Sequence, residues 1–126
     1  MNHALQLSDL GQIALTVSDV ATAKKFYHQV LGLKFLFDAG PNLAFLAAGD
    51  IRLMLSSEGA ATGAGKNSVL YFRTPAVKET YAALLERGAK GEHAPKLIAR
   101  MPDHELWMAF VRDPDGNLVG LMEERR

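Results

Sequence analysis

The alternation of apolar and polar positions predicts two similar runs of secondary structure. Near the start, Ile13, Leu15 and Val17 alternate with polar or small residues, the two-residue period of a strand with one buried face. From Val20 to Leu31 the apolar residues recur at helical spacing. Three further strands are predicted at residues 33–37, 43–47 and 51–55. The first half therefore predicts a strand, a helix and three strands.

The second half repeats this order after a linker of small residues at 57–67. It contains a predicted strand at 69–73, a helix that begins at Val77, and strands at 96–100, 106–111 and 118–122. The whole pattern predicts an α+β fold. Two tandem βαβββ modules, at about residues 8–56 and 68–124, make up one domain that spans residues 1–126.

Cap and turn residues separate these elements. The pair Ser18-Asp19 offers an N-cap for the first helix, and Gly32 suits the left-handed position just past its end. Gly49-Asp50 predicts a hairpin turn. The run Asp113-Pro114-Asp115-Gly116 predicts another tight turn before the last strand.

Composition excludes several classes of function. The 126 residues include 14 Lys and Arg against 14 Asp and Glu, and the net charge of zero argues against a nucleic-acid partner. The sequence has no cysteine, which excludes a disulfide framework, a thiolate metal site and a cysteine nucleophile. It shows neither a signal peptide nor an apolar run near the ~20 residues that span a membrane. We therefore expect a cytoplasmic protein without a membrane partner.

Two segments resemble a known family. Phe26-Tyr27 and Leu31-Gly32-Leu33 follow a strand that ends near Asp19, and the run 110–117 (Phe-Val-Arg-Asp-Pro-Asp-Gly-Asn) precedes the last strand. These motifs resemble the two modules of the vicinal oxygen chelate superfamily, which includes glyoxalase I, extradiol dioxygenases, fosfomycin resistance enzymes and bleomycin resistance proteins. The resemblance covers nearly the whole chain. It implies a curved mixed sheet around a cleft, with the helices outside, and a homodimer.

The resemblance also implies where a metal would bind. In this superfamily a divalent metal commonly lies on the floor of the cleft, held by His or Glu side chains. The corresponding positions here are Gln12, Met54, Val69 and Gly120. Valine and glycine have no side-chain donor, the Met sulfur suits soft ions such as Cu(I), and glutamine is a weak neutral ligand. We therefore expect no metal and no other cofactor.

Strand alternation predicts which side chains line the cleft. The strand at 106–111 could contribute either Trp107 or its neighbours Leu106 and Met108. An apolar lining with a few polar groups is typical of a site for an organic ligand, and an arginine can bind a carboxylate. The methionines fit an ordinary core equally well. The predicted ligand-binding residues are Gln12, Arg52, Met54, Val69, Tyr71, Arg73, Trp107, Gly120 and Met122.

The sequence leaves three functions open. The first is metal-free binding of a small, partly aromatic molecule that is neutral or anionic. The second is an enzyme of the lyase, isomerase or dioxygenase type, in which His104 acts as a general base or, with Glu105, as a metal ligand. A histidine in this loop fits an exposed surface residue as well. The third is a structural or regulatory module whose cleft is filled.

Overall fold

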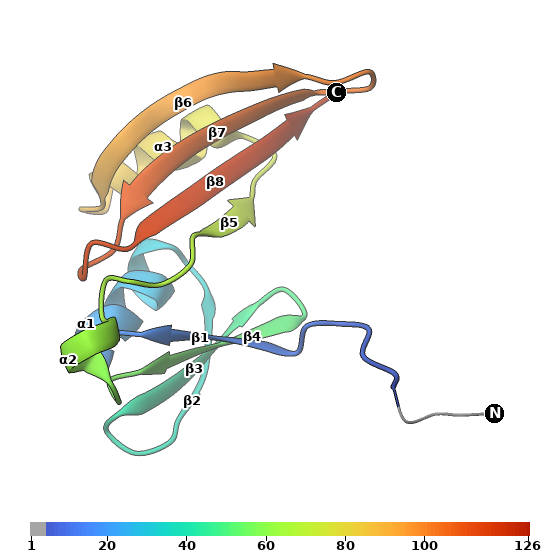
Figure 1. The fold of residues 1–126 in the computed structure, drawn as a ribbon. Coiled ribbons are helices and arrows are strands. Elements are labelled where there is room, and N and C mark those ends of the chain that lie inside the picture. Colours follow the sequence, from blue (N-terminus) through green and yellow to red (C-terminus); the bar gives the residue numbers. More distant parts are fainter. Residues whose placement is uncertain (1–4) are drawn as a thin grey trace.

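The chain forms two modules, each with a four-stranded sheet, in a computed structural model that describes residues 5–126 (Figure 1). The predicted α+β fold of two βαβββ modules is confirmed. Module one contains β1 (Gln12–Thr16), α1 (Val20–Lys24), η1 (Lys25–Val30), β2 (Lys34–Asp38), β3 (Leu43–Ala48) and β4 (Ile51–Ser56). After α2 (Ala60–Gly63), module two contains β5 (Leu70–Arg73), α3 (Val77–Glu86), β6 (Lys90–Arg100), β7 (Glu105–Arg112) and β8 (Leu118–Arg125). None of the helices in the described part of the chain is long and apolar enough to cross a membrane.

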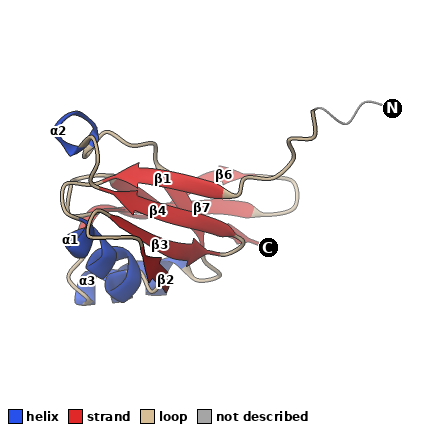
Figure 2. Cartoon of the chain, turned by 90° about the horizontal axis from the view of Figure 1, so that it is seen from below, coloured by secondary structure: helices blue, strands red, loops and turns tan. Residues whose placement is uncertain are grey.

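The two sheets have the same strand order. Sheet one is β1-β4-β3-β2, and sheet two is β5-β8-β7-β6. In each, the first strand of the module lies parallel to the last, while the other neighbours are antiparallel. A parallel pair needs a long crossover connection, and the helix that follows the first strand is part of it. Figure 2 shows sheet one in front of β6 and β7, so the sheets form two separate layers.

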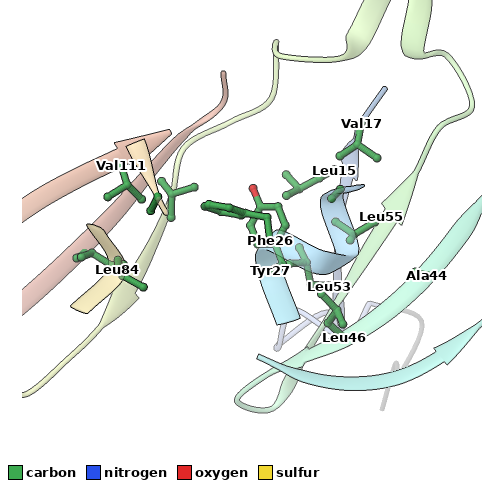
Figure 3. Packing of buried hydrophobic residues seen from close by; sticks show 14 of the residues in the cluster. Leu15, Val17, Phe26, Tyr27, Ala44, Leu46, Leu53, Leu55, Leu84 and Val111 are labelled. Atoms are coloured by element: carbon green, nitrogen blue, oxygen red, sulfur yellow. The ribbon is translucent and has the colours of Figure 1, made fainter. Parts of the chain in front are cut away.

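One core joins the two modules. Phe26 of η1 points toward Leu84 and Val111 of module two (Figure 3). Val17 and Val111, one from each module, are fully buried, and burying each such side chain is worth about 1.5–3 kcal/mol. The face of each sheet that carries core residues is called its inner face here, and the opposite face its open face. Helix η1 lies between the inner face of sheet one and module two.

The predicted cap and turns of module one are confirmed. The Asp19 carboxylate accepts a hydrogen bond from the N–H of Thr22 at 3.0 Å, which caps α1. Gly32 has a φ of 85° and Gly49 a φ of 62°, values that L side chains rarely adopt. Between the Asp19 cap and Gly32, η1 continues α1 as a π-helix.

Two elements differ from the prediction. Strand β6 begins at Lys90 instead of residue 96. The hydrophobic pattern did not indicate this earlier start, because the first five residues of the strand are all exposed and show no alternation. Such an edge strand, with bulges and Pro95 within it, lacks the two-residue signal. The segment 57–67 also contains the short helix α2, which the small residues did not indicate.

The turn at residues 113–117 connects the modules. Asp113 is only 5% exposed, and its Oδ2 accepts hydrogen bonds from the hydroxyl of Tyr27 and the amide of Asn117, both at 2.8 Å. Its Oδ1 accepts from the backbone N–H groups of Asp115 at 2.9 Å and Asn117 at 2.8 Å. Burial and the neighbouring Asp113 carboxylate raise the pKa of Tyr27, so its phenol stays protonated and donates. The predicted turn is therefore also the contact point for η1.

Further bonds link the end of β1 to module two. The Ser18 N–H donates to Asp115 at 3.0 Å, and the Ser18 hydroxyl bonds the same carboxylate. The Asn67 side chain accepts from the Thr16 N–H at 3.0 Å and donates to the Thr16 carbonyl at 2.9 Å. Gly65 has a φ of 78°, and a Cβ there would lie 2.8 Å from the Asp115 carbonyl oxygen. The segment 57–67 thus packs against both modules.

Removing the Tyr27 hydroxyl tests how much the hydrogen bond between Tyr27 and Asp113 contributes to the stability of the fold. Tyr27→Phe leaves the buried Asp113 carboxylate with three of its four donors, so we expect the free energy of unfolding to fall by about 1–3 kcal/mol. Urea denaturation measures it. Tyr81→Phe is the matched control, since no hydrogen bond of the Tyr81 hydroxyl is seen within residues 5–126. Equal losses in the two variants would contradict the assigned role.

Candidate functional site

Strand register fixes which side chains share the open face of sheet one. Ile13 and Leu15 face the core, so Gln12, Ala14 and Thr16 face the other way. Residues directly opposite on neighbouring strands share a face. The resulting rows on the open face, from β1 to β2, are Gln12, Arg52, Ala47 and Lys34, then Ala14, Met54, Phe45 and Phe37.

Three predicted site residues come together on this face. The Nε of Arg52 donates to Oε1 of Gln12 at 3.0 Å, and its guanidinium carbon lies 5.4 Å from the ring centroid of Phe45. The Gln12 amide also lies 3.7 Å from the sulfur of Met54. Phe37 stacks on Phe45 with ring centroids 4.6 Å apart. These five residues are called the Arg52 cluster.

A second group lies on the open face of sheet two. The Tyr71 ring covers Gly120, and a Cβ at position 120 would lie 2.5 Å from Cδ2 of that ring. Tyr71 also meets Phe110 edge to face, with centroids 5.7 Å apart, and His93 meets Phe110 in the same way at 5.8 Å. These four residues are called the Tyr71 cluster. Met122 shares this face, two residues along β8 from Gly120.

Trp107 lies on the inner face of sheet two, so its predicted place in the lining is wrong. The alternation of β7 puts Trp107 on the same side as the buried Ala109. Its ring lies under two cations, with Lys78 Nζ at 4.9 Å and the Arg125 guanidinium carbon at 4.5 Å from the centroid. The alternatives, Leu106 and Met108, therefore occupy the open face.

The remaining predicted residues lie on or next to β5. Val69 and Arg73 line a cavity of about 590 Å³ between β5 and module one, whose other walls include Ile13 and Leu53. Tyr71, already placed in its cluster, also borders this cavity. Arg73 is directed toward solvent and pairs loosely with Glu124, at 3.8 Å. The predicted site residues are thus divided between this cavity and the two open faces.

The four positions that the resemblance assigns to a metal do not fit one. The Gln12 amide is engaged by Arg52 and Met54, and Val69 offers no donor atom. Position 120 has no side chain, and the Tyr71 ring fills the space above it. A hard divalent cation needs several oxygen or imidazole donors at once. Elsewhere in residues 5–126, no group of three or more His, Asp or Glu side chains is arranged to hold a metal.

His104 lies between two carboxylates. Its Nδ1 is 2.7 Å from Asp103 Oδ1, and its Nε2 is 3.3 Å from Glu124 Oε2, with the side chain only 12% exposed. The hydrogen bond from His104 holds the pKa of the Asp103 carboxyl below its usual value. Glu105, the carboxylate that the sequence placed beside His104, accepts from the Trp107 indole instead. Both ring nitrogens therefore face protein oxygens, and His104 is not the exposed residue that a loop position favoured.

The contact between Tyr71 and Gly120 can be tested by adding one methyl group. Gly120→Ala forces the Tyr71 ring aside, so we expect the free energy of unfolding to fall by about 1–3 kcal/mol. In a Tyr71→Ala background the same change should cost much less, giving a coupling energy measurable by urea denaturation. Gly11→Ala is the control, because a Cβ there meets no atom within 4 Å. An equal cost of Gly120→Ala in both backgrounds would refute the contact.

Comparisons with known proteins agree with this fold. The sequence profile of the Glyoxalase/Bleomycin resistance protein/Dioxygenase superfamily matches residues 9–121. The uncharacterized protein YraH of Bacillus subtilis (strain 168) is 31% identical over 126 residues, covering 87% of this chain and 94% of YraH.

Two solved structures share the fold. TnmS3, an antibiotic binding protein from Streptomyces sp. CB03234, superposes with a TM-score of 0.79 and 29% identity, over 95% of this chain and 98% of TnmS3. The lactoylglutathione lyase from Agrobacterium tumefaciens has a TM-score of 0.75 and 24% identity, over 94% of this chain and 95% of the lyase, a likeness of fold alone. With the profile match over most of its length, the chain belongs to the Glyoxalase/Bleomycin resistance protein/Dioxygenase superfamily.

Proposed function

We propose that this chain binds a small organic molecule, partly aromatic and neutral or anionic, without a metal ion. The observation that carries the proposal is the Tyr71 ring packed on Gly120, because an aromatic surface occupies one of the positions that the family resemblance assigns to a metal ligand. Tyr71 is 46% exposed and Phe37 is 44% exposed, so both clusters offer ring surface to a ligand. The antibiotic binding protein TnmS3, similar over nearly the whole chain, supports binding as the class of function.

The enzymatic alternative has no comparable support. A general base needs one nitrogen directed at the substrate proton. In His104 both ring nitrogens lie against carboxylate oxygens, those of Asp103 and Glu124.

We also propose that the protein acts as a homodimer. In one chain the Arg52 and Tyr71 clusters lie on different sheets. A second copy could place the Arg52 cluster of one subunit opposite the Tyr71 cluster of the other. The segment before β1 supports an interface, since Leu5, Leu7 and Leu10 are 87%, 97% and 67% exposed, and exposed apolar surface of this kind marks a contact site. The cytoplasmic location stays a prediction from the composition.

A thermal-shift screen tests the binding function. One panel holds aromatic acids, amides and alcohols, and the other holds Mn²⁺, Fe²⁺, Ni²⁺ and Zn²⁺. A compound at 100 times its Kd stabilises the fold by about 2.7 kcal/mol. At roughly 4 °C per kcal/mol, this raises the melting temperature by roughly 10 °C. We expect organic compounds to raise the melting temperature, and we expect Tyr71→Ala to reduce this rise. Shifts with metals alone, or with neither panel, would overturn the proposal.

Sedimentation equilibrium tests the homodimer. We expect a particle of twice the 13.7 kDa chain mass at micromolar concentration. The double variant Leu5→Ser/Leu7→Ser should raise the dimer Kd at least tenfold, because burying each leucine contributes about 1.5–3 kcal/mol. Leu85→Ser is the control, since Leu85 is also an exposed leucine but lies on α3 and not in the segment before β1. A monomer throughout this range would contradict the proposal.

A further inference from the structure

We infer that the Arg52 cluster is a subsite for an aryl carboxylate, with Arg52 binding the carboxylate and Phe45 and Phe37 contacting the ring. This inference rests on the proposed function and names the ligand class that sheet one selects. It depends on three observations. The Arg52 guanidinium is held in place but has no acidic partner, the surrounding face is positively charged, and a row of aromatic residues lies beside it.

The guanidinium of Arg52 is held in place without being neutralised. Its Nε donates to Gln12 at 3.0 Å and its plane lies near the Phe45 ring, so two contacts on neighbouring strands fix it. Neither contact is an anion, and within residues 5–126 no carboxylate lies within 4 Å of Arg52. The terminal Nη groups keep the fork geometry that binds a carboxylate through two parallel hydrogen bonds.

Most of the other six arginines of the chain have a carboxylate partner, which Arg52 lacks. Five of them pair with a carboxylate, and the sixth donates to a backbone carbonyl. These are Arg73, Arg100, Arg112, Arg125 and Arg126, with acidic partners, and Arg87, which donates to the Val30 carbonyl at 3.1 Å. Among the arginines, Arg52 and Arg87 are therefore the two whose charge a ligand can neutralise without breaking an ion pair seen in residues 5–126, and of these two Arg52 lies on the open face of sheet one.

Within strands β1 to β4, the charged residues on the open face of sheet one are both positive. Arg52 and Lys34 lie in one row on either side of Ala47. The acidic residue of β2, Asp38, stands opposite the buried Ala44, on the other face, and is paired with Lys24 at 3.2 Å. No Asp or Glu belongs to the face in the described strands β1 to β4. Such a face attracts an anion and repels a cation.

The next row along the sheet supplies the aromatic contact. Phe45 lies diagonally across from Arg52 on the neighbouring strand and stacks on Phe37, which is 44% exposed. Met54 adds a polarizable sulfur next to the rings. A molecule that places a carboxylate on Arg52 would therefore lay a planar ring along Phe45, so the two rows together select an aryl carboxylate over an aliphatic one.

A matched pair of probes tests the subsite. Calorimetric titration at neutral pH and low salt compares 2-naphthoate with the neutral 2-naphthamide, which has the same ring. We expect Arg52→Gln to raise the Kd of 2-naphthoate at least tenfold and to change that of 2-naphthamide no more than about twofold. Arg52→Lys should lie between, because it keeps the charge but loses the fork. Phe45→Leu should weaken both probes.

Arg100→Gln is the control variant, because it removes the same charge from a 75% exposed arginine of module two. Equal Kd values for the two probes, or equal effects of Arg52→Gln and Arg100→Gln, would overturn the carboxylate subsite and leave organic binding intact. The same holds if 2-naphthoate does not bind at millimolar concentration while another panel compound does. If no organic compound binds, the proposed function itself fails.

Discussion

The buried carboxylate of Asp113 is the group on which the arrangement of the two modules depends. A carboxylate that is 5% exposed is costly unless hydrogen bonds satisfy it, and here four donors do so. Three of the bonds shape the turn between β7 and β8, and the fourth comes from Tyr27 of module one. The bonds that shape the turn and the bond that docks η1 therefore meet in one side chain, so a change in either affects the other.

This junction determines where the candidate sites lie. Because η1 and the core occupy the inner faces, the open faces of the two sheets are left for ligands or for a second copy. Together with the shared core, the hydrogen bonds of Tyr27, Ser18 and Asn67 fix the relative orientation of the Arg52 and Tyr71 clusters. Asn67 also donates to Asn117 at 3.0 Å, so the segment between the modules takes part in the same network.

The sequence predicts those parts of the molecule that depend on local periodicity. Alternation on β1 and β4 was enough to group Gln12, Arg52 and Met54 on one face, and the turn signals located the ends of most elements. It could not place Trp107, because the choice between its two faces depends on α3 and on the cations above the ring. Nor could the sequence pair His104, in the loop before β7, with Glu124 of β8. Contacts between distant segments have no local signal.

Gly120 and Tyr71 show that the candidate site has an aromatic surface of its own and is not defined only by the absence of metal ligands. A glycine at position 120 offers no side-chain donor, and it also makes the space in which the Tyr71 ring lies, so the absence of a donor and the aromatic contact have the same structural cause. Charge shows the same principle. The net charge of zero says little about which ligand charge the site would favour. The distribution is more informative, because the acid of strands β1 to β4, Asp38, lies on the other face and pairs with Lys24. Arg52 and Lys34 are thus the charged residues of these strands on the open face. Recognition follows that local field, and an average over the chain conceals it.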